Sequence, residues 1–239
     1  MNHILVTDPC YTIRKGAREG LSGNWKPALL SSLLYIAVLA LPMFFAVQLF
    51  GKDFGTGVGN LYSLIVQGPF MLGYSYFILK LFRREPTSPP DVFYGFEHFG
   101  KAFLLAIVTT LFILLWSLLL IIPGVIASYR YRLAYYVILD NPSIGVLEAI
   151  AESKRLMRGN KGKLFILDLT FIGWALLAAL TFGLGMIALL PYMATATVVF
   201  YELANGNITE RTAQISYGVK PEVQTPKIRD AFEDDEIKS

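Results

Sequence analysis

Hydrophobic and polar positions are arranged along this chain in long blocks rather than in short alternation. Six predominantly apolar segments can be marked, with most charged residues in the stretches between them. The segments are Pro27–Phe50, Leu61–Phe82, Lys101–Ile122, Gly124–Asp140, Lys163–Thr181 and Gly185–Leu203. A helix of about 20 apolar residues spans the roughly 30 Å hydrocarbon core of a bilayer. The pattern therefore predicts an all-α, polytopic integral membrane protein with six transmembrane helices, although the fourth segment is short.

The segments follow one another as three hairpins. The phrases "GNWKPALL", "HFGKAFLL" and "GNKGKLFIL" place a lysine at the start of the first, third and fifth segments. Simple hairpin periodicity explains this echo, and so does a three-fold duplication. We expect a cytoplasmic N-terminal segment (1–26), a six-helix membrane domain (27–204) and a mostly disordered cytoplasmic tail (205–239), whose composition is polar.

Amphipathic, interfacial connectors are predicted before the third and fifth segments. In the second connector, Asn141 is a candidate N-cap and Pro142 the first helical residue. Apolar positions follow on one side, and basic residues gather towards the end of the helix. Such a helix suits either the surface of an anionic leaflet or a solvated connection. The candidate membrane-surface contacts are Lys154, Arg155, Arg158, Lys161 and Lys163.

Composition supports a membrane protein and charge placement gives its orientation. Hydrophobic residues make up 54% of the chain, charged residues 16%, and the mean hydropathy is +0.51. If all six segments cross and the N-terminus is cytoplasmic, 18 of the 21 Lys and Arg residues lie on the cytoplasmic side. The first apolar segment is too long for a cleaved signal peptide. We therefore expect a multi-pass protein of the cell (inner) membrane with both termini in the cytoplasm.

Residues that could carry covalent or metal chemistry are scarce. Cys10 is the single cysteine, and His3 and His98 have no partner at a metal-ligand spacing. Nucleophile-elbow, phosphate-loop and dinucleotide motifs are absent from the sequence. The net charge of +3 gives no reason to expect nucleic acid as a partner. We predict no catalytic residue, metal or cofactor, and an enzyme is the disfavoured class.

Two arginines in the fourth segment raise the main functional question. Arg130 and Arg132 fall near the middle of "GVIASYRYRLAYYVILD", where each costs roughly 2.5–3.5 kcal/mol to insert. On a continuous helix they point to nearly opposite sides, so each needs protein, water or a ligand around it. Tyr129 and Tyr136 are three before and four after Arg132, which would give a stripe able to hold a phosphate or carboxylate.

Asp168 is the clear acidic residue within an apolar segment, and its depth in the fifth segment nearly matches that of Arg132. We therefore expect Arg132 and Asp168 to pair across the helix bundle. A structural ion pair, a binding site for an anionic lipid headgroup or solute, and a charge relay all remain open for Arg130, Arg132, Tyr129, Tyr136 and Asp168.

Several phrases resemble one bacterial integral membrane family, catalogued as domain of unknown function 975. They include "GYSYFILKLFR", "FYGFEHFGKAFLL", "LAYYVILDNPSIGVLEAI" and "SKRLMRGNKGKLFIL", and the resemblance covers roughly residues 23–202. It implies a six-helix membrane protein and brings no assigned activity and no functional residues. A looser similarity to the membrane portion of some glycerophosphodiester phosphodiesterases faintly suggests work on lipids.

Two functional hypotheses follow from the residues. The first is binding or passage of an anionic lipid or small solute within the bundle, near the fourth segment, with membrane lipids as partners. The alternative is a membrane scaffold or regulatory subunit that recruits protein partners through its cytoplasmic surface helices and tail. An intramembrane enzyme is a third, disfavoured hypothesis, because paired polar groups are scarce within the segments.

Overall fold

The computed structural model describes residues 4–181 and 183–208, and within them the chain is helical without a strand. In chain order the elements are α1 (Cys10–Leu21), α2 (Trp25–Phe50), α3 (Lys52–Phe82), the 3-10 helix η1 (Pro89–Phe93), α4 (Tyr94–Glu97), α5 (Phe99–Leu119), α6 (Ile121–Tyr131), α7 (Ala134–Asp140), α8 (Val146–Leu156), α9 (Lys161–Leu169), α10 (Ile172–Leu180) and α11 (Leu184–Asn205). Most of the predicted tail lies outside the described residues.

Five stretches of the described chain are long and apolar enough to cross a membrane. They are α2, α3, α5, the stretch Lys161–Leu180 that holds α9 and α10, and α11. They correspond to five of the six predicted spans. The sixth, Gly124–Asp140, was expected as one helix, but the structure divides it between α6 and α7. Neither part is long enough to cross a membrane alone.

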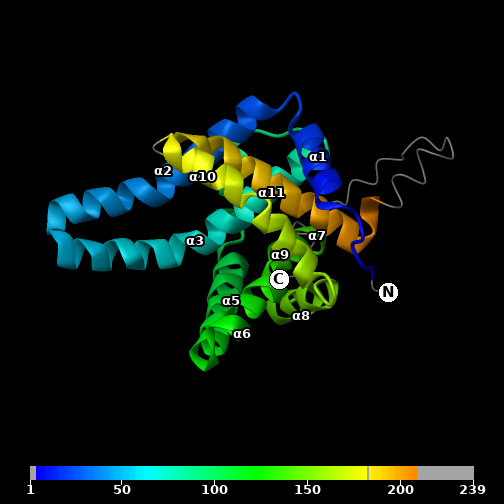
Figure 1. Cartoon of the computed structure of the whole chain (residues 1–239). Helices are drawn as coiled ribbons and strands as arrows, with labels where there is room; N and C mark the ends of the chain where they lie inside the picture. The colour runs from blue at the N-terminus through cyan, green and yellow to red at the C-terminus, as the bar shows by residue number, and fades with distance from the viewer. Residues whose placement is uncertain (1–3, 182, 209–239) are drawn as a thin grey trace, which may run out of the picture.

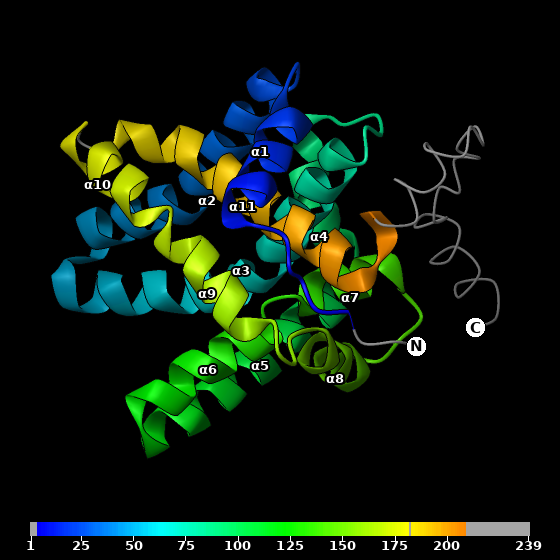
Figure 2. The ribbon, with the colours of Figure 1, turned by 45° about the vertical axis from the view of Figure 1, so that its right-hand side comes forward.

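Three pairs of helices project from the molecule, and each pair turns back at its far end. α2 packs along α3, α5 along α6, and α10 along α11 (Figure 1). We call the far end of each pair its tip. α9 leads into α10. The other elements, α1, η1, α4, α7 and α8, gather on the opposite side, and together with the near ends of α3 and α11 they form what we call the body (Figure 2).

Close backbone contacts hold the connector before α5 against α3. A Cβ atom on Gly73 would lie 1.8 Å from the carbonyl oxygen of Val92, and one on Gly95 would lie 1.9 Å from that of Pro69. Only glycine fits at such distances, so this pair of glycines allows η1 and α4 to cross the middle of α3.

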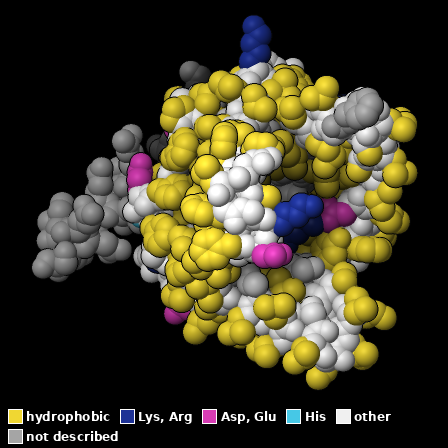
Figure 3. Space-filling view, turned by 90° about the vertical axis from the view of Figure 1, so that its left-hand side faces the viewer, with side chains coloured by type: hydrophobic (Ala, Val, Ile, Leu, Met, Phe, Trp, Pro, Cys, Tyr) yellow, Lys and Arg dark blue, Asp and Glu magenta, His cyan; other side chains and the backbone are white. Residues whose placement is uncertain are grey.

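The outer faces of the three pairs are apolar. In the most apolar window of α2, only 6% of residues are buried inside the protein, and in that of α5 only 17%. Hydrophobic side chains dominate the side of the molecule where the tips lie, and few charged groups interrupt them (Figure 3). A soluble protein rarely exposes apolar patches of this size. The distribution is consistent with a membrane protein.

Candidate functional site

The arginine-bearing segment is interrupted at the second arginine. α6 ends at Tyr131, Arg132 is its C-terminal cap, and α7 begins at Ala134. Arg132 and Leu133 keep right-handed backbone angles (φ −59° and −88°), so the interruption is a tight step rather than a loop. The helical spacing between residues before and after Arg132 is nevertheless lost.

Arg132 forms an ion pair with Asp168 of α9. Arg132 Nη1 lies 2.5 Å from Asp168 Oδ2, and Nη2 lies 3.3 Å from Oδ1. The hydroxyl of Tyr129 donates a further hydrogen bond to Oδ2 at 2.9 Å. The pair expected from the sequence is therefore present, and both carboxylate oxygens have protein partners. Because Asp168 compensates its charge, Arg132 is not the cation most available to an outside anion.

Tyr136 interacts electrostatically with Arg132, but the hydrogen bonds to Asp168 come from Tyr129 and Arg132. The Tyr136 side chain is buried, and its ring stacks on that of Tyr201 in α11, with 5.4 Å between the ring centres. The predicted tyrosine–arginine–tyrosine stripe assumed one continuous helix, and the step at Arg132 divides it. Tyr129 stays beside Arg132, whereas Tyr136 turns into the body.

Arg130 occupies different surroundings from Arg132. Its guanidinium carbon lies 5.9 Å from the centre of the Trp116 ring, which is within the range of a cation–π contact. Its carbonyl oxygen accepts a hydrogen bond from Ser153 of α8 at 2.8 Å. Arg130 also repels Lys161 at the start of α9. Across residues 4–181 and 183–208, neither of these two half-buried cations forms an ion pair with a carboxylate.

A groove opens between α6 and α9 beside these cations. It has a volume of about 330 Å³. Its lining residues are Ile121, Ile122, Val125, Ile126, Tyr129, Lys161, Gly162 and Phe165. The apolar members are themselves largely exposed, so the groove faces the surroundings of the protein. One basic residue, Lys161, thus stands in an otherwise nearly apolar lining, and Arg130 lies close to it.

A second ionic cluster, which the sequence did not reveal, lies in the body. Arg83, which caps α3, pairs with Asp140 at the end of α7 (Nη1 to Oδ1, 2.7 Å) and with Glu202 near the end of α11 (Nε to Oε1, 2.8 Å). The Tyr201 hydroxyl donates to Asp140 Oδ2 at 2.6 Å. We call these four residues the body network.

The body network is well shielded from solvent. The side chains of Arg83 and Glu202 are each 6% exposed, and that of Asp140 is 15% exposed. Burial alone would lower the pKa of Arg83, but the adjacent carboxylates of Asp140 and Glu202 raise it above its ordinary value. Arg83 therefore stays charged.

A sequence signal for the body network existed. Arg83, Asp140 and Glu202 each follow an apolar run directly, in "ILKLFR", "YVILD" and "VVFYE". By charge alone, Arg83 is one of 21 Lys and Arg residues. Spacing along the chain could not show that these three ends meet, because their separation in sequence is large.

The basic residues predicted to contact the membrane surface take different roles. Lys154 is exposed on α8 and Arg158 is exposed in the turn that follows it, whereas Arg155 pairs with Glu152 on α8. Lys161 enters the groove, and Lys163 is half-buried in the first turn of α9.

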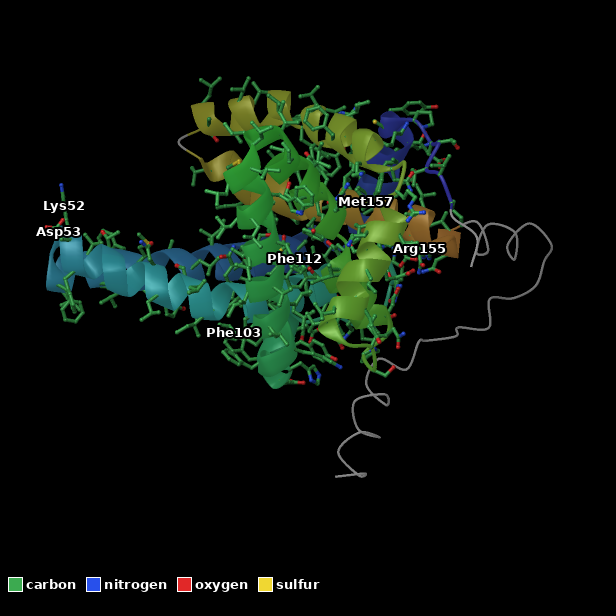
Figure 4. The ribbon with its side chains drawn as sticks, turned by 90° about the horizontal axis from the view of Figure 1, so that it is seen from below. Lys52, Asp53, Phe103, Phe112, Arg155 and Met157 are labelled. Atoms are coloured by element: carbon green, nitrogen blue, oxygen red, sulfur yellow. The ribbon has the colours of Figure 1, made fainter. Side chains whose placement is uncertain are left out.

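The apolar side of α8, expected to face either lipid or solvent, packs inward instead. Val146, Ile150 and Met157 are buried, and Met157 lies where α8 meets the rest of the body (Figure 4). Leu147, at the edge of the same side, is 65% exposed, so it is the large apolar side chain that α8 keeps free for contact with a membrane surface.

The side chains that could bind a metal ion are scattered in the described part of the chain. Within residues 4–181 and 183–208, there is no group of three His, Cys, Asp or Glu side chains that could hold a metal ion. His98 lies against the ring of Tyr94, with 5.0 Å between ring centres.

Comparison with known proteins identifies a family. The sequence matches a family described as a protein of unknown function (DUF975) over residues 9–127 and 117–211. No curated protein matches the chain. No solved structure matches it either.

Proposed function

Because the chain belongs to the DUF975 family, whose description assigns no activity, we propose from its geometry that it binds an anionic phospholipid in the groove between α6 and α9. The observation that carries this proposal is the combination of an outward-facing apolar groove with two cations that have no acidic partner among the described residues. An anionic phospholipid has the two complementary features, because its phosphate can pair with the cations and its acyl chain can contact the apolar lining.

The two ends of such a lipid have separate contacts in the groove. Lys161 and Arg130 would attract the phosphate, and their mutual repulsion would be relieved by a negative charge between them. Ile122, Ile126 and Phe165 would contact the acyl chain. Hydrocarbon burial and charge attraction both act in this arrangement, as they do for other lipid-binding surfaces.

The surrounding membrane is proposed to be the cell (inner) membrane, with the body on the cytoplasmic side. The basic residues of the connectors and of α8 support that orientation, since cytoplasmic loops are enriched in Lys and Arg. Both termini would then be cytoplasmic. The body network supports one feature of this arrangement, because it brings the ends of α3, α7 and α11 to the same side of the protein.

Lipid retention in native mass spectrometry tests the proposal. The protein would be reconstituted with phosphatidylglycerol or with the zwitterionic phosphatidylcholine and then released gently from its nanodisc. We expect phosphatidylglycerol to stay bound to the wild type, and Arg130→Ala/Lys161→Ala to lower its retention by roughly tenfold. Phosphatidylcholine should be retained less and should respond less to the substitution.

A matched control removes the same number of charges elsewhere. Lys26 and Lys154 are exposed and lie outside the groove, so Lys26→Ala/Lys154→Ala should leave retention unchanged. Filling the groove with Ile126→Trp should expel lipids of both headgroups. Equal retention by the wild type and Arg130→Ala/Lys161→Ala would rule out the proposed site.

A further inference from the structure

The α5–α6 pair differs from the other two pairs in where its tip lies. Ile121 and Ile122, at that tip, line the same groove as Lys161 and Gly162, the first two residues of α9. Lys161–Leu180 is long enough to cross a membrane, so its two ends would lie about 30 Å apart on opposite faces. The tip of α5–α6 is thus beside the entry of the next span rather than beside its exit.

The length of α6 agrees with this position, whereas α5, with 21 residues, has to run obliquely to the membrane normal to stay within one leaflet. α6 has 11 residues and is about 16 Å long, which is close to the depth of one leaflet. Ser153 of α8 bonds to the carbonyl oxygen of Arg130, and α8 carries the exposed Lys154. The end of α6 therefore lies level with a helix whose exposed residues include Leu147, Glu148 and Lys154. In Figure 2, the α5–α6 pair leaves the body obliquely and reaches less far than the other two pairs.

The composition of the tip points to hydrocarbon as its surroundings. Leu118, Ile121 and Ile122 are 87%, 81% and 73% exposed, and the sequence holds no polar side chain from Leu118 to Ala127. The tip of α2–α3, in contrast, carries Lys52 and Asp53 (Figure 4). Each fully exposed large apolar side chain in water forgoes roughly 1.5–3 kcal/mol of burial free energy.

The turn itself is suited to a medium without water. Only Leu120 separates the two helices, and its N–H donates to the carbonyl of Trp116 while its carbonyl accepts from the N–H of Gly124. Pro123 has no N–H group to satisfy. Both backbone groups of Leu120 are therefore satisfied, which lowers the cost of placing the turn in hydrocarbon.

We infer that the α5–α6 pair does not cross the bilayer but lodges in the cytoplasmic leaflet, with its tip surrounded by lipid chains. The chain then crosses four times, through α2, α3, α9–α10 and α11. The distribution of basic residues is unchanged, because a pair that crosses twice and a pair that does not cross both return to the side they left.

Site-directed cysteine labelling tests this inference independently of lipid binding in the groove. In a Cys10→Ser background, single cysteines would replace Leu120, Lys52, Thr181 and Lys154, and intact cells would be treated with a membrane-impermeant maleimide. We expect Lys52→Cys and Thr181→Cys to react from outside, and Lys154→Cys only in inside-out vesicles. Leu120→Cys should react from neither side, although it should react fully after denaturation.

A second measurement gives Leu120 a positive signal. A fluorophore attached to Leu120→Cys in purified, reconstituted protein should be quenched by lipids that carry bromine on their acyl chains, whereas one on Lys52→Cys should not. Outside labelling of Leu120→Cys at the rate of Lys52→Cys would show a full crossing and overturn the inference. Labelling of Leu120→Cys in inside-out vesicles at the rate of Lys154→Cys would place the tip in the cytoplasm and would also overturn the inference. Protection of Lys52→Cys on both sides would show that the α2–α3 pair does not cross, which would overturn the inference as well.

Discussion

The body network and the groove both contain arginine, but they treat its charge in opposite ways. Arg83 is almost fully buried and is held by two carboxylates that end other helices. Arg130 is half-buried, lies over an aromatic ring and faces another cation. Burying a charge is too costly unless opposite charges are buried beside it. A partly exposed charge stays hydrated, so it needs no protein partner and remains available to a ligand.

The comparison separates structural charges from candidate binding charges. The body network joins helices that are far apart in sequence, so its role is to hold the ends of α3, α7 and α11 together. The two cations at the groove hold no described element to another through an ion pair. The Arg132–Asp168 pair is intermediate, because its side chains are 32% and 21% exposed and it links α6 to α9.

Removal of the central cation of the body network should have the largest effect on stability. Arg83→Met keeps much of the side-chain volume but leaves Asp140 and Glu202 buried without their cation. Breaking a buried ion pair in this way costs about 3–5 kcal/mol. We expect a lower melting temperature of the detergent-purified protein, by roughly 10 °C. Arg18→Met, on the exposed side of α1, is the control, and equal melting of the two variants would contradict a structural role for the network.

The half-buried pair should show a smaller loss that a second substitution reverses. Arg132→Leu leaves the Asp168 carboxylate with only its hydrogen bond from Tyr129, which should cost about 1–3 kcal/mol. In Arg132→Leu/Asp168→Leu no charge is left unpaired, so most of that stability should return. Thermal unfolding of the two variants and the wild type measures this. A double variant less stable than Arg132→Leu would show that the pair contributes more than mutual neutralisation.

The cations at the groove should matter little for stability. Lys161→Ala and Arg130→Ala each remove a charge without an ionic partner, and the unfolding free energy should change by no more than about 0.5 kcal/mol. Either substitution also removes the repulsion between Lys161 and Arg130, which acts to raise the unfolding free energy slightly. Melting curves in lipid-free detergent measure the effect, and a loss as large as that of Arg132→Leu would erase the distinction drawn between the two kinds of charge.

The smallest effect should come from the surface pair on α8 and should depend on pH. The hydrogen bond from Arg155 lowers the pKa of Glu152 below its ordinary value. The pair therefore stabilises the fold above the ordinary pKa of a glutamate, and this contribution is lost as the pH falls through the lowered pKa. Glu152→Gln should be less stable than the wild type at neutral pH, by less than about 1 kcal/mol, and equally stable in strong acid. A pH-independent difference in melting temperature would assign the effect to packing instead.

The sequence alone determined the helical class, the family and most of the long apolar helices. These properties depend on composition and on runs of apolar residues. Such runs are local features, and their length and hydrophobicity determine whether a segment can cross a bilayer. The expected Arg132–Asp168 pair also followed from local reasoning, because positions along regular helices convert directly into depth. Asp168 could be singled out because acidic residues are so rare within the apolar segments.

Only the tertiary structure decided where the fourth segment breaks, which arginine lacks an acidic partner, and which chain ends meet. The step at Arg132 sends Tyr136 into the body, and the body network joins Arg83 to Asp140 and Glu202, which lie 57 and 119 residues further along the chain. The oblique path of α5–α6 is also invisible to hydropathy, since a segment is equally apolar whether it crosses a bilayer or ends within one leaflet. Such contacts depend on how distant helices pack together, and no local pattern of residues encodes that arrangement.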